Sequence, residues 1–171
     1  VLAAGHDSGD ALEYADELFK KDKEIVLAAV QNLGYALAYA DDSFKKDREI
    51  VLAAVQRSGS ALEYADDSFK KDKEIVLAVV QSRGGDALAY ADDSFEYVDD
   101  SFKKDREGVL AAIQINGHAF RYADDFLKKD KEVVLAAVQS PGDKGGARNL
   151  EYADDSLKKD REIVLTAVKK N

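Results

Sequence analysis

Apolar and polar residues follow one another in the same order in successive segments of the chain. In residues 61–81, ALEYADDSFKKDKEIVLAVVQ, a half with apolar and acidic residues precedes a lysine-rich junction and a second, mostly apolar half. Closely similar segments occupy residues 11–31 and 36–56. Aligned on the element A-L-x-Y-A, the repeats begin at Ala11, Ala36, Ala61, Ala87, Ala119 and Asn149. The spacings of 25, 25, 26, 32 and 30 residues indicate a tandem array, for which periods of roughly 20 to 50 residues are typical.

The first half of each repeat predicts an amphipathic helix. With side chains about 100° apart around a helix, residues 11–19 separate into an apolar and an acidic side. The apolar side contains Ala11, Leu12, Ala15 and Phe19, flanked by Tyr14 and Leu18, and the acidic side contains Glu13, Asp16 and Glu17. We therefore expect one helix from about Ala11 to Phe19, and an equivalent helix in the other repeats.

The second half predicts another helix, with apolar residues around most of its circumference. Asp22 is a favourable N-cap, and Glu24 places an anion in the first turn, where the helix dipole favours it. The run IVLAAV at residues 25–30 requires neighbours on several sides. Gly34 is expected to end the helix, because glycine tolerates left-handed dihedrals. A strand is the alternative for this run, but period-two alternation is absent and the alanines favour a helix.

These patterns predict an all-α protein, specifically an α-solenoid of tandem two-helix repeats of about 25 residues. We expect a single repeat array over residues 1–171. Residues 1–10 are expected to be a partial repeat, because VLAAGHDSG aligns with the end of a complete one, VLAAVQRSG. We accordingly expect the chain to be a fragment or processed product of a longer array. One repeat has too few large apolar side chains to fold alone, so neighbours must share their apolar faces.

The order of the two halves resembles a known family. The pattern A-L-x-Y-A followed by K-K-D-K/R-E-I/V-V-L-A-A-V-Q-x-x-G resembles the repeats named domain of unknown function 4116, which are short tandem helical repeats. The resemblance covers nearly the whole chain. It implies an array of helices, and it brings no assigned activity, catalytic residue or cofactor. Helical arrays of short repeats generally act as binding scaffolds, which is an analogy at the level of the fold.

Two segments depart from the repeat. In residues 89–102, AYADDSFEYVDDSF, a seven-residue phrase is doubled, so the first helix there is predicted either to be two turns longer or to loop out. A longer helix would carry its apolar face on Leu88, Ala91, Phe95, Val98 and Phe102. Gly108 replaces the Ile or Val of other repeats, so we expect loose packing at the start of that second helix. Residues 140–149, SPGDKGGARN, contain the only proline and predict a flexible loop.

Composition narrows the possible partners. A net charge of −9, with 35% charged residues, argues against electrostatic binding to nucleic acid or to an anionic membrane. The chain has no cysteine, which excludes disulfides and thiolate metal sites. Its longest apolar runs, such as IVLAVV, are too short to span a membrane, and no signal peptide is visible. We expect a soluble protein with no membrane insertion and no nucleic-acid partner, and its compartment stays open.

Adjacent acidic residues recur in the first half of the repeats. The pairs are Asp41-Asp42, Asp66-Asp67, Asp92-Asp93, Asp99-Asp100, Asp124-Asp125 and Asp154-Asp155. Clustered carboxylates can bind calcium or serve as the acid–base pair of a hydrolase. The spacing of a calcium loop is missing, however, and a catalytic pair is normally unique rather than copied in each repeat. We interpret the pairs as a solvated helix face, with the doubled segment as the best candidate for a cation.

Adjacent lysines recur in the junctions. They are Lys20-Lys21, Lys45-Lys46, Lys70-Lys71, Lys103-Lys104, Lys128-Lys129 and Lys158-Lys159. A ladder of cations could follow a phosphate backbone, but acidic residues lie within five positions of each pair. We expect charge-balanced loops, with Asp–Lys contacts between neighbouring repeats. Two residues further on, Lys and Arg alternate along Lys23, Arg48, Lys73, Arg106, Lys131 and Arg161, which indicates duplication of a block of two repeats.

The aromatic and histidine residues have structural interpretations. Tyr14, Tyr39, Tyr64, Tyr90, Tyr122 and Tyr152 flank the first helices and are predicted to seal the seam between helices, although such a row could also stack on a partner or pigment. His6 and His118 lie beside glycine near turns, without partners at metal-binding spacing. GDKGG at residues 142–146 lacks the flanking strand and helix of a phosphate-binding loop.

The function expected from the sequence is a non-enzymatic scaffold for protein–protein interaction. The alternative is a structural protein that self-assembles head to tail, or a subunit of a larger complex. The expected partner surface is the polar strip of the second helices: Glu24, Gln31, Glu49, Gln56, Glu74, Gln81, Glu107, Gln114, Glu132 and Gln139, continued by Glu162. Because the repeats are alike, this strip suits a repetitive or extended partner. We expect a protein partner or a second copy, and no catalytic residue, cofactor, metal or small-molecule ligand.

Overall fold

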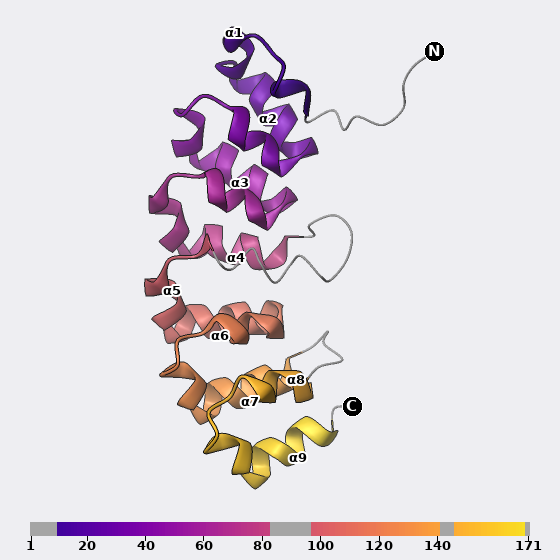
Figure 1. Ribbon diagram of the computed structural model, residues 1–171, viewed down its shortest axis with the longest axis vertical. Coiled ribbons are helices and arrows are strands. Elements are labelled where there is room, and N and C mark those ends of the chain that lie inside the picture. The colour runs from indigo at the N-terminus through magenta and orange to yellow at the C-terminus, as the bar shows by residue number, and fades with distance from the viewer. Residues whose placement is uncertain (1–9, 83–96, 141–145, 170–171) are drawn as a thin grey trace, which may run out of the picture. The chain divides into compact units, whose positions relative to one another are not determined.

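The computed structural model describes residues 10–82, 97–140 and 146–169. Within these ranges the regular elements are helices, and none is a strand. The chain forms two compact units, Val1–Tyr97 (unit 1) and Val98–Asn171 (unit 2), which Figure 1 colours in chain order. The prediction of an all-α protein is confirmed for the described residues.

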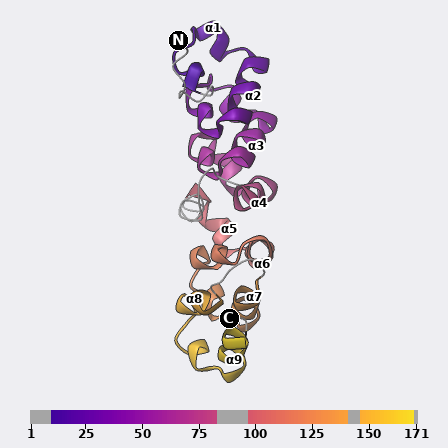
Figure 2. The same cartoon turned by 90° about the vertical axis from the view of Figure 1, so that its right-hand side faces the viewer.

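In unit 1, short helical segments alternate with longer α-helices. The long helices are α2 (Lys23–Asn32), α3 (Arg48–Arg57) and α4 (Lys73–Gln81). The short segments, where η denotes a 3-10 helix, are η1 (Asp10–Leu12), α1 (Glu17–Lys20), η2 (Gly34–Tyr39), η3 (Phe44–Lys46), η4 (Gly59–Tyr64) and η5 (Asp67–Lys71). Helix α2 packs against α3, and α3 packs against α4 (Figures 1 and 2).

Unit 2 uses the same kinds of element. Its long helices are α6 (Arg106–Ile115), α7 (Lys131–Gln139) and α9 (Arg161–Lys169). Its short segments are α5 (Asp100–Lys104), η7 (Gly117–Tyr122), η8 (Leu127–Lys129), α8 (Gly146–Glu151) and η9 (Leu157–Lys159). Helix α7 packs against both α6 and α9, so successive long helices are neighbours within this unit as well.

The long helices begin where the sequence predicts. The Asp22 side chain accepts hydrogen bonds from the backbone N–H groups of Glu24 (3.0 Å) and Ile25 (3.2 Å), as an N-cap should. The equivalent caps are Asp47, Asp72, Asp105, Asp130 and Asp160. The second helix of the repeat, with its N-cap and an acidic residue in the first turn, is therefore confirmed.

The single helix predicted over residues 11–19 is wrong. Segment η1 ends at Leu12, and α1 begins only at Glu17. The backbone is extended at Asp16, with ψ at 149°, and the Asp16 carboxylate accepts a hydrogen bond from the N–H of Leu18, which starts a new helical turn. An equivalent hydrogen bond, from the backbone N–H two residues later to the aspartate carboxylate, is accepted by Asp41, Asp66, Asp99, Asp124 and Asp154. Two short segments thus replace the expected helix.

Gly34 does not have the left-handed role that the sequence suggested. Helix α2 ends at Asn32, and Gly34 is the buried first residue of η2, without a left-handed φ. A Cβ atom at Gly34 would collide with the backbone oxygen of Ala54 in α3 and approach Ser58 Cβ to 3.0 Å. The glycine is needed because the two repeats approach each other closely here.

Each unit has an apolar core between neighbouring repeats. In unit 1 its largest fully buried side chains are Val26, Val30, Leu37, Ile50, Val51, Val55, Leu62 and Ile75. In unit 2 the core is formed around Val109, Ile113, Phe120, Leu127, Val133, Val134, Val138 and Ile163. Adjacent residues such as Ile50 and Val51 are both buried, because α3 has a long helix on either side. The expectation that long helices need several neighbours holds within each unit.

The two departures from the repeat are partly described. Loose packing around Gly108 is wrong, since Gly108 is buried and a Cβ there would lie 2.9 Å from Cε2 of Phe102. Most of the doubled segment lies outside the described residues, and where it is described, Asp99 caps a separate helix, α5, with Val98 and Phe102 buried. Of the loop predicted over 140–149, residues 141–145 lie outside the described ranges, and the last four belong to α8.

Candidate interaction surface

The residues predicted to form the partner surface lie at two levels of the long helices. Each glutamate occupies the second position of its helix, and each glutamine lies seven residues later, two turns along the axis. All are exposed: Glu24, Glu49, Glu74, Glu107, Glu132 and Glu162 at the first level, and Gln31, Gln56, Gln81, Gln114 and Gln139 at the second. The structure therefore places these side chains at the surface, and whether they bind a partner stays a prediction.

Between the two levels, each helix displays apolar side chains. Leu27, Leu52 and Leu77 are half-buried, and Ala28 is exposed. Spacings of three and four residues place Glu, Leu, Ala and Gln on one helix face. Each long helix of unit 1 consequently presents a short strip with an exposed acid at one end, an exposed amide at the other and a half-buried leucine between them, whereas the alanine that is exposed in α2 is half-buried in α3 and buried in α4.

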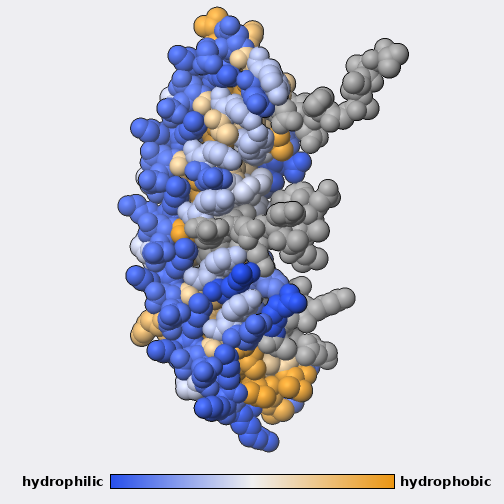
Figure 3. All heavy atoms as spheres, in the orientation of Figure 1, coloured by the Kyte–Doolittle hydropathy of each residue, from blue (hydrophilic) through white to orange (hydrophobic). Residues whose placement is uncertain are grey.

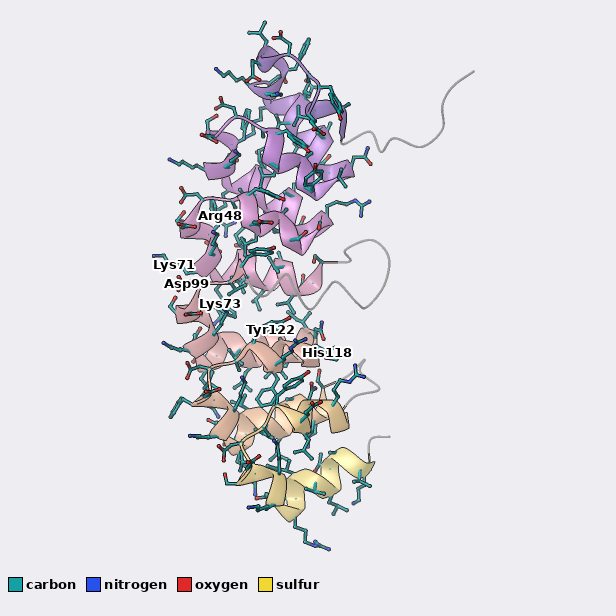
Figure 4. All side chains as sticks on the ribbon, viewed as in Figure 1. Arg48, Lys71, Lys73, Asp99, His118 and Tyr122 are labelled. Carbon is teal, nitrogen blue, oxygen red and sulfur yellow. The ribbon has the colours of Figure 1, made fainter. Side chains whose placement is uncertain are left out.

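Four of the glutamates, Glu49, Glu74, Glu132 and Glu162, already have partners from the preceding repeat. In unit 1, Lys23 Nζ lies 2.9 Å from Asp47 Oδ2 and 2.8 Å from Glu49 Oε2. Arg48, labelled in Figure 4 at the start of α3, pairs with Asp72 at 3.2 Å and with Glu74 at 2.8 Å. One cation thus bridges the N-cap aspartate and the first-turn glutamate of the next long helix.

The same bridge occurs twice in unit 2. Arg106 pairs with Asp130 at 2.8 Å and also with Glu132. Lys131 lies 2.8 Å from Asp160 Oδ2 and 2.8 Å from Glu162 Oε2. The sequence showed the alternation of Lys and Arg at this position, and the role of the position in pairing neighbouring repeats was missed.

The bridges shift the pKa of their members in opposite directions. Hydrogen bonds to Glu49 and Asp47 raise the pKa of Lys23, and the same lysine lowers the pKa of Asp47. Hydrogen bonds to Asp160 and Glu162 raise the pKa of Lys131 to about 12. These pKa shifts favour the charged forms of Lys23, Asp47 and Lys131, and the bridges contribute to the surface that Figure 3 colours hydrophilic.

The paired aspartates separate into two structural roles. The first member caps a helical turn, and hydrogen bonds from Ser43 lower the pKa of Asp41. The second member pairs with the lysine three residues later, as Asp42 does with Lys45 at 2.9 Å. In the described ranges, no group of three or more Asp, Glu, His or Cys residues is arranged to hold a metal ion. Of the doubled segment, Asp99 and Asp100 are described, and they have these same two roles.

The lysine pairs contact acids, but mainly within their own repeat. Lys20, Lys45, Lys70, Lys103, Lys128 and Lys158 each form an ion pair with an acid three residues before. The expected Asp–Lys contact between repeats is represented by Lys21 and Asp41, at 3.9 Å. A closer link is a backbone bond in which the N–H of Asp41 donates to the carbonyl oxygen of Lys20 (3.1 Å).

The tyrosine row is less regular than predicted. Tyr14 is 83% exposed, whereas Tyr39, Tyr64, Tyr122 and Tyr152 are half-buried and Tyr90 lies outside the described residues. Tyr35, which the repeat pattern did not single out, lies 6.1 Å from Tyr64 between ring centroids and therefore joins two repeats. In unit 2, Arg121 lies over the rings of both Tyr122 and Tyr152, and labelled Tyr122 and His118 belong to η7 (Figure 4). His118 is half-buried, and His6 lies outside the described residues.

An apolar hollow lies at the first repeat. This first-repeat hollow has a volume of about 510 Å³ and is lined by Ala11, Leu12, Ala15, Phe19, Ile25, Ala28, Ala29 and Asn32. Only Asn32 contributes a polar side chain to the lining. The hollow therefore suits apolar side chains, and its lining offers no acid, base or nucleophile for chemistry.

A family model matches the chain four times, over residues 6–45, 47–96, 105–143 and 144–171, and its description is "Domain of unknown function (DUF4116)". No curated protein matches the chain, and no solved structure matches it. Among the described helices, none is both long and apolar enough to cross a membrane.

Proposed function

We propose that this chain, which belongs to the DUF4116 family, is a non-enzymatic α-solenoid that acts as a scaffold for protein–protein interaction. The proposal treats residues 1–171 as one repeat array. It is supported by the order of elements within each unit, where successive long helices are neighbours and share an apolar core. Such arrays characteristically use a repeated surface, rather than one pocket, to bind their partners.

The observation that carries the proposal is the strip of exposed Glu, half-buried Leu and exposed Gln that recurs on α2, α3 and α4. The glutamates of the later strips are held in ion pairs between repeats. The amide groups of Gln31, Gln56 and Gln81, by contrast, form no hydrogen bond within the described residues. Each amide can donate and accept, so this row can bind the backbone of an extended partner while Leu27, Leu52 and Leu77 contact its side chains.

Photo-cross-linking tests this surface. A photoreactive residue at Gln56 should capture a partner protein from the native source, and the same residue at Asp67, on the charged side, should not. Unlabelled chain should compete for that partner, whereas a chain with Gln31, Gln56 and Gln81 changed to Glu should compete at least tenfold less well. Equal capture from both positions, or equal competition by both chains, contradicts the proposal.

A second candidate function is self-assembly, in which copies join head to tail. It is favoured by apolar side chains exposed at the first and last long helices, where Ile25 is 37% and Val168 is 65% exposed. Unlike faces that complement one another generate open assemblies or rings. Sedimentation velocity at rising concentration tests this candidate, since a chain that sediments as a monomer throughout contradicts it.

A further inference from the structure

The junctions inside each unit show which neighbour each position of a long helix faces. Ile50 and Ile75 are fully buried, whereas Ile25, the equivalent residue of the first long helix, is 37% exposed. This position therefore faces the preceding repeat. Val30 and Val55, five residues further along their helices, are fully buried, and each of their helices is followed by another long helix.

Helix α9 exposes a face that α2, α3, α6 and α7 bury. Val168 corresponds to Val30 in α2 and to Val138 in α7, which are both fully buried, yet Val168 is 65% exposed. Leu165, on the same helix, is 40% exposed. Apolar surface accordingly gathers over this part of unit 2 in Figure 3.

The first repeat exposes the complementary face. The first-repeat hollow is lined by Ile25 and Ala29, whose equivalents in α3 are the fully buried Ile50 and Ala54. In α3 this face is covered by α2. Among the described residues, which begin at Asp10, no preceding long helix covers this hollow, which corresponds to the site that such a helix occupies elsewhere in unit 1.

The charged residues beside the exposed face of α9 and beside the first-repeat hollow are complementary as well. In the four bridges described above, a cation at the start of one long helix pairs with the cap aspartate and the first-turn glutamate of the next. Arg161 is the corresponding cation of α9, and it has no carboxylate partner within the described residues. Asp22 and Glu24 are the corresponding acids of α2, and no cation pairs with them there.

A backbone hydrogen bond also recurs at the junctions between neighbouring repeats. The N–H of Asp41 donates to the carbonyl oxygen of Lys20, and the N–H of Asp66 donates to that of Lys45 (2.9 Å). Unit 2 repeats this bond from Asp124 to Lys103 (2.9 Å) and from Asp154 to Lys128 (3.0 Å). By the repeat alignment, the N–H of Asp16 in the first repeat and the carbonyl oxygen of Lys158 in the last have no such bond within the described residues.

We infer that a second copy of this chain docks on the first-repeat hollow through α9. Val168 of one copy covers Ile25 and Ala29 of the next, and Arg161 pairs with the first-turn glutamate, Glu24. We assign a second copy as the occupant because the last repeat has the same groups, at the equivalent positions, that one repeat uses to contact the next within each unit. These groups are the apolar side chain, the cation and the backbone carbonyl oxygen. This junction rests on the self-assembly candidate proposed above, and it specifies the residues that form it.

Charge reversal with a complementary partner tests the junction. Sedimentation velocity of the 171-residue chain should show association. Arg161→Glu and Glu24→Lys should each weaken it by about tenfold in dissociation constant, since an attraction becomes a repulsion. Mixing the two variants should restore association, because the acidic α9 of the first then meets the basic α2 of the second, and the remaining two ends are unchanged. Arg148→Glu, the same charge change on α8, should have no effect.

Val168→Asp provides a test independent of charge pairing. The Val168 side chain is largely exposed, so the variant should keep the helical circular-dichroism spectrum. Its dissociation constant for association should rise at least tenfold. If the chain associates but neither Val168→Asp nor Arg161→Glu weakens it, the junction is wrong while self-assembly stands. If the unchanged chain is monomeric at every concentration, both are wrong.

Discussion

Gly34 occupies a position where the surrounding backbone leaves no room for a side chain. The atom that a Cβ would strike is the carbonyl oxygen of Ala54, which belongs to α3 and cannot rotate away. Gly117 is also closely approached in unit 2, but by side-chain atoms, since a Cβ there would lie 2.9 Å from Asn149 Nδ2 and 2.9 Å from Ser140 Cβ. Sequence alone suggested a conformational reason for the first of these glycines, because contacts between repeats are not visible in a local pattern.

Replacement of Gly34 by alanine should therefore destabilise the protein. The added methyl group must push α3 away from η2, and overpacking of this kind costs about 1–3 kcal/mol. We expect a lower urea midpoint with an unchanged helical spectrum for Gly34→Ala, measured by circular dichroism.

Gly108→Ala is the matched comparison. Its Cβ would meet side-chain atoms of Asp105 and Phe102, which can move, and alanine favours a helix by about 1 kcal/mol over glycine. The loss of stability caused by Gly108→Ala should be smaller than the loss caused by Gly34→Ala. A larger loss at Gly108 would contradict the distinction between backbone and side-chain obstruction.

The bridge between Lys131 and Asp160 predicts a dependence of stability on pH. Lys131 lowers the pKa of Asp160 in the folded protein. The stability that the bridge contributes is therefore fully present above the pKa of an unfolded aspartate, about 3.9, and it is lost as the pH falls through the lower pKa of the folded state. The pKa of Lys131 is raised to about 12 in the folded protein. The same contribution to stability is therefore fully present below the pKa of an unfolded lysine, about 10.4, and it is lost as the pH rises toward the folded pKa.

Asp160→Asn isolates this effect, because asparagine is also a good N-cap but carries no charge. The variant should be less stable than the unchanged chain at pH 6, and the difference should shrink as the pH falls to 2. Urea unfolding across this range measures both chains. A difference independent of pH would mean that the bridge contributes nothing to stability.

At the scale of elements, the sequence predicted the long helix well and its short neighbours poorly. Asp22 was identified as an N-cap because a long apolar run follows it. Asp16 and Asp41 cap turns in the same way, yet they also fall on the polar side of an amphipathic helix, so the periodicity accommodated them as ordinary helical residues. The helix is broken by the extended backbone at Asp16 and, in the next repeat, by the bond from the Asp41 N–H to the carbonyl oxygen of Lys20.

The N-cap of α3 offers a test that separates capping from pairing. Asp47→Ala removes both the bonds to the N–H groups of Glu49 and Ile50 and the pairing with Lys23, whereas Asp47→Asn retains a cap. We expect Asp47→Ala to lose about 1 kcal/mol more than Asp47→Asn, measured by urea unfolding. Equal losses would show that the ion pair, rather than the cap, is what Asp47 provides.

At the scale of the whole molecule, an all-α array follows from the repeat, but the links between repeats do not. Lys23 and Asp47 are 24 residues apart, and nothing in the local sequence distinguishes Lys23 from Lys20 and Lys21, which precede it. The residues of the predicted partner surface lie at exposed positions, although three of its glutamates, Glu49, Glu74 and Glu132, also form the links between repeats. The glutamines were identifiable because they interrupt an otherwise apolar helix at each repeat.

A truncated chain tests whether residues 1–171 behave as one array. Unit 2 has its own apolar core, so residues 98–171 alone should retain a helical spectrum. In an array, stability is a sum over repeats and shared interfaces, so the isolated unit should unfold at a lower urea midpoint than the same residues in the full chain. Hydrogen exchange of the α7 amides reports this difference in both chains, at concentrations where each is monomeric. Equal protection of α7 in both would indicate two independent domains and contradict the single array.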